Sequence, residues 1–359
     1  MGAIKDFRRR YGTIMTGYIL VACGVWMFGM ILLPQLQMID YSLWYEDTAD
    51  QSKLDQQIEA RYIDLQKAQA ELRRLGREEA PDAARQAEIA TETQALESEI
   101  ARLESEIAEL EEGFGTVERE YGFRNYGYLL GNTLHRTIFL KTIWASFLVT
   151  VVALVMCYPI AFYLAQVAPA DHAALLMLGL IVPYWINEIL RTFAWLMILS
   201  YQGIANQFFT GVGLIDTPID FLNGNWGVII GMTYAYILFM VFPIYNTIDT
   251  LDRNQLEAAR DLGAPWWRIH WRIVIPHAKP GIAVGCIMTF MLAAGSYAVP
   301  QILGGRSSLW FTQIIYNWFF EGNDWNIGSA YAFLLLVICI AFILIMMRVF
   351  KVGMQDIAR

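Results

Sequence analysis

Long apolar stretches alternate with short polar segments along this chain. A helix that crosses a bilayer needs about 20 mostly apolar residues. Six stretches meet that requirement: 12–34, 143–166, 174–200, 226–248, 281–303 and 329–347. The third is the least apolar, because it contains Asn187, Glu188 and Arg191. The pattern predicts an all-α, polytopic membrane protein with six transmembrane helices.

A different periodicity fills the segment between the first two spans. Apolar residues recur there at alternating steps of three and four, the heptad spacing of a coiled coil. The seam runs through Leu54, Ile58, Leu65, Ala68, Leu72 and Leu75, then through Ile89, Thr93, Leu96, Ile100, Leu103, Ile107, Leu110 and Phe114. Gly76 and Pro81 interrupt it, which predicts an antiparallel helical hairpin with arms ~40 Å long. The alternative is a charged, partly disordered loop, but such a loop would not need to keep a seam.

Composition excludes an ordinary soluble globular domain. Of 359 residues, 56% are hydrophobic and only 17% are charged. The four cysteines lie within apolar runs and lack the spacing of a metal site, so we expect them to be small buried hydrophobes. They are Cys23, Cys157, Cys286 and Cys339.

Charge is distributed unevenly and predicts the orientation. The net charge is -8, but residues 40–124 alone hold 22 acidic against 10 basic residues. Basic residues flank the apolar runs at the N-terminus (8–10), in the 249–280 loop and at the C-terminus. An even number of spans places these three segments on one side, and positive flanks are typical of the cytoplasmic side. The hairpin would then be extracytoplasmic.

One short polar segment, 253–276, carries helix signals of its own. Asn254 followed by Glu257 is a capping-box pattern, and Gly263 stands where a C-terminal glycine belongs. Pro265 then starts a second helix and Pro276 is expected to close it. The pattern predicts a helix, a tight turn and a helix on the cytoplasmic side, with three tryptophans at the membrane interface.

This loop resembles the EAA signature of the membrane subunits of binding-protein-dependent ABC importers. The matching residues are Glu257, Ala258, Ala259, Gly263, Ile273, Ile275 and Pro276, although the family usually has Leu at the position of Ile275. Fragments between residues 126 and 350, such as PYWINEILRTFAW at 183–195, are similar to the spermidine/putrescine-type branch. The resemblance implies the type I ABC importer permease fold and makes the 253–276 loop the coupling helix that docks on an ATPase subunit.

Several partners follow from the resemblance. It implies an ATP-binding subunit dimer, a second homologous permease subunit, more often different than identical, and an extracytoplasmic substrate-binding protein in a bacterial inner membrane. ATP and magnesium would bind to the partner ATPase, since this chain contains no Gly-Lys dipeptide and so no phosphate-binding loop. We expect no enzyme activity, metal, resident cofactor or nucleic-acid partner for this chain.

Four parts are expected along the chain. They are a cytoplasmic segment with the first span (1–39), the extracytoplasmic hairpin (40–125), the core permease domain (126–350, with the coupling loop at 250–280) and a cytoplasmic tail (351–359).

Ionisable residues inside a span are costly, so Glu188 and Arg191 are candidates for function. One hypothesis places Glu188 and Asn187 on the translocation pathway, where they would set the charge preference for substrate. The other pairs Glu188 with Arg191, three residues away on one helix face. Aromatic residues could form a cage for an ammonium group or could serve packing alone: Tyr184, Trp185, Tyr236 and Tyr297. His270 and His277 are expected to be interfacial side chains of the loop.

Three functional hypotheses remain open. The first is import of a polyamine-like organic cation, and the second is import of an opine or another small amino compound. The third comes from the hairpin: a non-transporting membrane protein in which ATP hydrolysis inside moves the hairpin to regulate a partner outside. A hairpin that only scaffolds the assembly of an importer is compatible with the first two.

Overall fold

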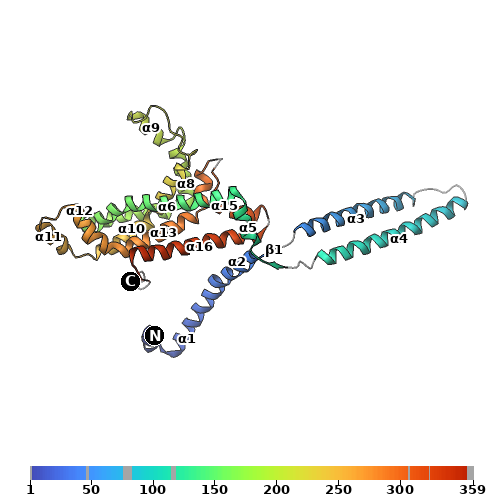
Figure 1. Cartoon of the computed structure of the whole chain (residues 1–359), viewed down its shortest axis with the longest axis horizontal. Helices are drawn as coiled ribbons and strands as arrows, with labels where there is room; N and C mark the ends of the chain where they lie inside the picture. The colour runs from blue at the N-terminus through green and yellow to red at the C-terminus, as the bar shows by residue number, and fades with distance from the viewer. Residues whose placement is uncertain are drawn as a thin grey trace. The chain divides into compact units, whose positions relative to one another are not determined.

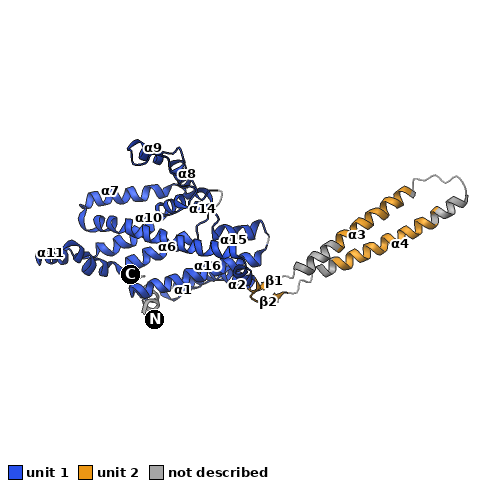
Figure 2. Ribbon diagram, turned by 45° about the horizontal axis from the view of Figure 1, so that its top comes forward, with its two compact units in different colours: residues 1–42, 125–359 blue, residues 43–124 orange. Residues whose placement is uncertain are grey.

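The computed structural model describes residues 2–45, 48–75, 83–114, 119–305, 308–322 and 324–353. The chain divides into two compact units (Figure 2). Unit 1 comprises Met1–Ser42 and Asn125–Arg359, and unit 2 comprises Leu43–Arg124.

Unit 1 is helical throughout its regular structure (Figure 1). Its first part contains α1 (Gly2–Met27), the π-helical turn η1 (Phe28–Leu32), α2 (Leu33–Leu43), α5 (Arg124–Gly131), α6 (Thr133–Phe162), the π-helical turn η2 (Tyr163–Val167), α7 (Ala170–Ile181), the 3₁₀ turn η3 (Val182–Trp185) and α8 (Glu188–Leu199). Its second part contains α9 (Ile204–Gly211), α10 (Trp226–Asp249), α11 (Arg253–Asp261), α12 (Trp266–Ile269), the π-helical turn η4 (His270–Val274), α13 (Ile275–Ala294), α14 (Ala298–Leu303), α15 (Phe311–Phe320) and α16 (Trp325–Phe350).

Five helical stretches in the described chain are long and apolar enough to cross a membrane: Gly12–Leu43, Thr133–Val167, Trp226–Asp249, Trp266–Ala294 and Trp325–Phe350. A sixth candidate is a bent pair, Ala170–Trp185 and Glu188–Gly211, whose halves meet at 99°. The prediction of one continuous helix over 174–200 is therefore wrong. The chain leaves the helix at Ile186, which is extended, and Asn187 then caps α8 by accepting a hydrogen bond from the amide of Ile189 at 2.8 Å.

The fifth span also differs from the prediction of 281–303. The helix begins earlier, at Trp266, and α13 ends at Ala294, before the separate short helix α14. Pro276 does not close the preceding helix. It lies inside the helical stretch Trp266–Ala294, directly after the π-helical turn η4, where the backbone already departs from α-helical hydrogen bonding.

Close backbone contact joins α10 and α13, which run side by side in unit 1 (Figure 1). A Cβ atom on Gly281 would overlap the carbonyl oxygen of Pro243 and the side chain of Thr247, and one on Gly285 would lie 2.8 Å from the sulfur of Met240. Small residues four positions apart allow two helices to approach closely. In a lipid environment, where the hydrophobic effect does not drive helix association, this close packing stabilises the pair.

Three of the four cysteines are buried, as expected for Cys157, Cys286 and Cys339. Cys23 is exposed, which corrects that expectation. It lies on the first candidate span, whose apolar window has no buried residue in this chain.

Unit 2 is built from two helices, α3 (Thr48–Leu75) and α4 (Ala83–Phe114), with a small antiparallel pairing of β1 (Trp44–Tyr45) and β2 (Glu120–Tyr121). Trp44 pairs with Tyr121 and Tyr45 with Glu120. Leu65 of α3 is buried against Leu103 and Ile107 of α4, three of the predicted seam positions. The predicted break at Gly76 and Pro81 lies outside the described residues.

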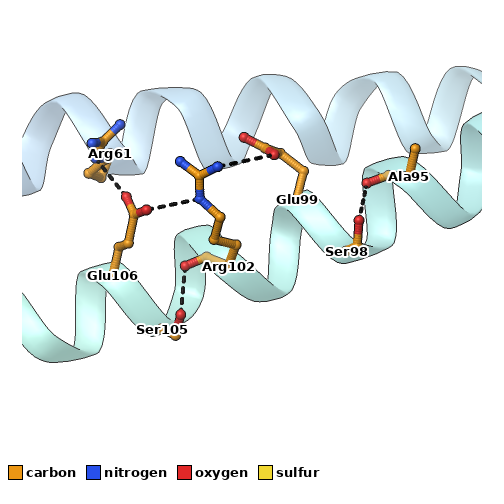
Figure 3. A network of polar contacts seen from close by, with 7 residues as sticks. All are labelled: Arg61, Ala95, Ser98, Glu99, Arg102, Ser105 and Glu106. Carbon is orange, nitrogen blue, oxygen red and sulfur yellow. Dashed lines mark hydrogen bonds and ion pairs between the residues drawn. The ribbon is translucent and has the colours of Figure 1, made fainter.

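Charged side chains accompany this seam (Figure 3). Glu106 of α4 accepts from Arg61 of α3 at 3.1 Å and from Arg102 of its own helix at 3.0 Å. The hydrogen bond and the charge of Glu106 raise the pKa of Arg102 above its ordinary value. Arg61, which breaks the apolar seam in the sequence, thus contacts the opposite helix through its charge.

The glycine contact gives a prediction for stability. Replacing Gly281 with Ala should lower the free energy of unfolding by roughly 1–3 kcal/mol, because backbone atoms of α10 must shift to admit the methyl group. Gly179→Ala is the matched control, since a Cβ there meets nothing within 4 Å. Thermal unfolding in detergent measures both. Equal melting temperatures for the two variants would contradict close packing at Gly281.

Candidate functional site

The predicted coupling loop is a helix–turn–helix, as expected. Its first helix, α11, is capped by Asp252, whose side chain accepts a hydrogen bond from the amide of Asn254 at 3.0 Å. The prediction of Asn254 as the N-cap is therefore wrong by two residues. Asp252 is an equally good capping residue, and the capping-box spacing to Glu257 misled the interpretation.

The turn after α11 follows from one glycine. Gly263 has φ +71°, its amide bonds to the carbonyl of Arg260 at 2.8 Å, and the amide of Ala264 reaches the carbonyl of Ala259 at 3.0 Å. These two bonds form a Schellman motif, which ends the helix and satisfies its last carbonyl groups. Pro265 then serves as the N-cap of α12.

Leu256 is the most buried side chain that attaches α11 to the rest of unit 1. Leu256 is 4% exposed and joins an apolar cluster with residues of α6, α10 and α13, whereas Glu257 and Ala258 are exposed and Ala259 is half-buried. Leu262 stands at the tip of the loop with 87% of its surface exposed. The solvent-exposed face of α11 thus has little side-chain bulk around Ala258.

The second half of the loop is more firmly held. Ile269 and Val274 are buried in the same cluster, and Ile273 is half-buried beside them, while Pro276 is exposed. The ring of His270 accepts or donates a 2.7 Å hydrogen bond with the hydroxyl of Tyr158. His270 is therefore a tether between α6 and the loop, a contact that its sequence position did not indicate.

Two further polar contacts fix the loop at its start. The side-chain amide of Gln166 donates to the carbonyls of Ile248 and Leu251 at 2.8 and 3.2 Å, so it covers the C-terminal end of α10. His277 and Thr250 are 3.0 Å apart, joining α13 to the same end. These contacts connect the start of the loop to η2, α10 and α13.

A second group of candidate residues surrounds the break between α7 and α8. The hydroxyl of Tyr184 donates to the carbonyl of Ala235 at 2.9 Å and accepts from the amide of Leu238 at 2.9 Å, so this side chain is bound to the backbone of α10. The guanidinium carbon of Arg191 lies 4.4 Å from the centre of the Tyr184 ring.

Glu188 faces a different partner. Tyr236, which is 5% exposed, donates its hydroxyl to a carboxylate oxygen of Glu188 at 3.3 Å. The ion pair between Glu188 and Arg191, one of the two hypotheses, is not formed among the described residues: Glu188 contacts Tyr236, and Arg191 lies over Tyr184. The spacing on one helix made the pair possible. The contact with Tyr184 lies across the break in the span, which the sequence did not reveal.

The remaining pathway candidates are dispersed. Asn187 is exposed and its side-chain oxygen is used as the cap of α8. Trp185 is 80% exposed, and Tyr297 packs against Tyr316 with ring centres 4.9 Å apart. The structure therefore brings Tyr184, Glu188, Arg191 and Tyr236 together and leaves Trp185 and Tyr297 without a described contact to that group.

No cluster of three metal-ligating side chains occurs in the described part of the chain.

Comparison with known proteins identifies the family. Residues 127–352, more than half of the chain, match the family described as the inner membrane component of binding-protein-dependent transport systems. The chain belongs to this family. It is a permease subunit of an ABC importer, a multi-pass inner membrane protein.

Its relatives include polyamine permeases. The chain is 37% identical over 224 residues to the spermidine/putrescine transport system permease protein PotB of Salmonella typhimurium strain SL1344, covering 62% of this chain and 77% of that protein. It is 37% identical over 214 residues to PotB of Escherichia coli K12, covering 60% and 77%, respectively. The matched family region begins only after α3 and α4.

A solved structure supports the type I permease fold. A chain of a bacterial ABC transporter involved in the import of the acidic polysaccharide alginate superposes with a TM-score of 0.54 at 18% identity, covering 65% of this chain and 84% of that one. At this identity the likeness concerns the fold.

The Schellman turn provides a local prediction. Gly263→Ala should speed backbone amide exchange within α11 roughly fivefold. An alanine in the left-handed backbone conformation costs about 1 kcal/mol, which lowers the free energy of local opening of the helix. Gly211→Ala is the control, because that glycine has no positive φ and open space for a Cβ. Hydrogen exchange with mass spectrometry measures both peptides. Unchanged exchange in the Gly263→Ala peptide would show that the turn does not hold α11.

Proposed function

We propose that this protein is one permease half of an importer that moves a polyamine-like organic cation into the cytoplasm, driven by ATP hydrolysis on a partner subunit. The observation that carries the substrate class is the carboxylate of Glu188, which lies at the break in a candidate span and forms no ion pair with Arg191 among the described residues. The similarity to spermidine/putrescine permeases supports the same class.

The proposed coupling element is α11 with its exposed tip. A short helix with alanines on an exposed face can enter a groove of an ATP-binding subunit, and the 87% exposed Leu262 is suited to fill an apolar pocket there. Closure of the ATP-binding dimer would push the loop, and its attachment to α6, α10 and α13 would carry the motion to the pathway. The sequence analysis did not identify Leu262 as a docking residue. The signal that could have identified it is an apolar residue next to the C-terminal glycine of an otherwise polar helix.

The proposed orientation follows from counting spans. If the bent pair crosses the membrane, six crossings place the N-terminus, the 250–265 loop and the C-terminus on one side, and each of these segments carries arginine or lysine. The positive-inside rule makes that side cytoplasmic and puts residues 46–118 on the periplasmic side. A re-entrant pair would instead leave the 250–265 loop on the side opposite the basic N-terminus.

The proposed partners are a dimer of ATP-binding subunits, a second and different homologous permease, and a periplasmic binding protein. ATP and magnesium would be held by the ATP-binding subunits.

The substrate class is tested first on the cognate binding protein. A ligand that binds only the folded state raises the melting temperature by mass action. Spermidine or putrescine should raise it selectively among a panel of polyamines, opines and small zwitterions. A shift with only a zwitterion or an anion would reject the cation assignment.

Glu188 provides the matching prediction in the permease. Glu188→Gln should lower uptake of the cation by the reconstituted complex about tenfold to a hundredfold, since it removes the carboxylate that would pair with the substrate's ammonium group away from water. Asp171→Asn, at an exposed carboxylate in the first turn of α7, is the control for the loss of one negative charge. Normal uptake by Glu188→Gln in an assembled complex would reject its place on the pathway.

Leu262 tests the coupling contact. Leu262→Glu should weaken co-purification of the ATP-binding subunit at least tenfold, because a carboxylate cannot be buried in an apolar pocket without a partner. Leu214→Glu, at a leucine 66% exposed in the 212–225 segment, is the control. Co-purification that survives Leu262→Glu would place the docking contact elsewhere.

A further inference from the structure

Arg191 occupies a costly position. Its Nε and Nη1 atoms are buried, and neither has a hydrogen-bond partner among the described residues. A guanidinium has five N–H donors and no acceptor, and buried donors without partners are destabilising. Some other interaction must therefore hold this side chain where it lies.

The ring of Tyr184 supplies that interaction. Arg191 lies over its face at 4.4 Å, within the range of a cation–π contact. The ring is fixed in turn, because the Tyr184 hydroxyl is bonded to both a carbonyl and an amide of α10. Tyr184 belongs to the 3₁₀ turn before the break, whereas Arg191 belongs to the helix after it. The contact therefore spans the break.

Arg191 does not pair with the nearby Glu188 among the described residues. The two residues are three apart on α8, a spacing at which opposite charges normally pair. In a medium of low dielectric their attraction would be strong. Yet the carboxylate contacts only the Tyr236 hydroxyl, at 3.3 Å, among the described residues.

We infer that Tyr184 determines charge specificity by position: its ring holds Arg191 away from Glu188 and so leaves the carboxylate available to a substrate ammonium group. This inference rests on the proposed function, because it takes Glu188 as a pathway residue. Without the ring, Arg191 is an internal cation that competes with the substrate for Glu188.

Uptake of radiolabelled spermidine by the full complex in proteoliposomes tests the competition. Tyr184→Leu should lower uptake at least tenfold, whereas Tyr184→Phe, which keeps the ring, should retain at least half. Adding Arg191→Gln to Tyr184→Leu should restore uptake to within threefold of wild type, because the competing cation is gone.

A matched aromatic residue controls the rescue. Trp195 also packs a ring near α10, with its centre 5.1 Å from that of Tyr234, but holds no cation in the described structure. Arg191→Gln should not rescue Trp195→Leu. Failure to rescue Tyr184→Leu, or equal rescue of both variants, would overturn the inference.

A measurement without substrate separates this inference from the proposed function. When Tyr184 is present, the changes in melting temperature caused by Glu188→Gln and by Arg191→Gln should sum to the change in the double variant. In the Tyr184→Leu background, where Glu188 and Arg191 can pair, the sum should differ from the double variant by several degrees. Additivity in both backgrounds overturns the role of Tyr184 whatever the substrate is. Non-additivity combined with normal uptake by Glu188→Gln supports that role and rejects only the pathway assignment.

Discussion

The close approach of α10 and α13 is the constraint on which unit 1 depends. α10 leads into the coupling loop and α13 continues from it, so Gly281 and Gly285 fix the two ends of the loop to each other. Within lipid, apolar surface alone does not drive helices together, and close backbone packing supplies the cohesion. Any force on α11 consequently acts on a single body that includes α6 through the shared apolar cluster.

A second constraint concerns charge inside the membrane. The break between α7 and α8 gathers a carboxylate, a guanidinium and two tyrosine hydroxyls, each of which would be costly if left alone in lipid. The backbone of α10 orients one tyrosine, which holds the guanidinium, and the other tyrosine reaches the carboxylate. The proposed selectivity thus depends on the helix that also leads to the coupling loop. This connection offers a physical path between ATP-driven motion and the substrate.

Sequence reasoning reached the helical class, the fold and the loop, because apolar length and the Gly263 turn are local signals. It missed the break at Ile186 and the end of α13 at Ala294, because a count of apolar residues over about 20 positions tolerates the few polar residues, such as Asn187 and Ser296, that mark both places. It also misassigned the cap of α11, where Asn254 and Asp252 are equally plausible locally. The partners of Glu188 and Arg191 depend on Tyr184 and Tyr236, and only tertiary packing brings those rings together.

The most direct measurement is uptake of radiolabelled spermidine into proteoliposomes that contain this permease, its partner permease and the ATP-binding subunits, with and without the loaded binding protein. The account predicts accumulation that requires both internal ATP and external binding protein. ATP hydrolysis that responds to an external partner without accumulation of any solute would contradict an importer and favour mechanical signalling through α3 and α4.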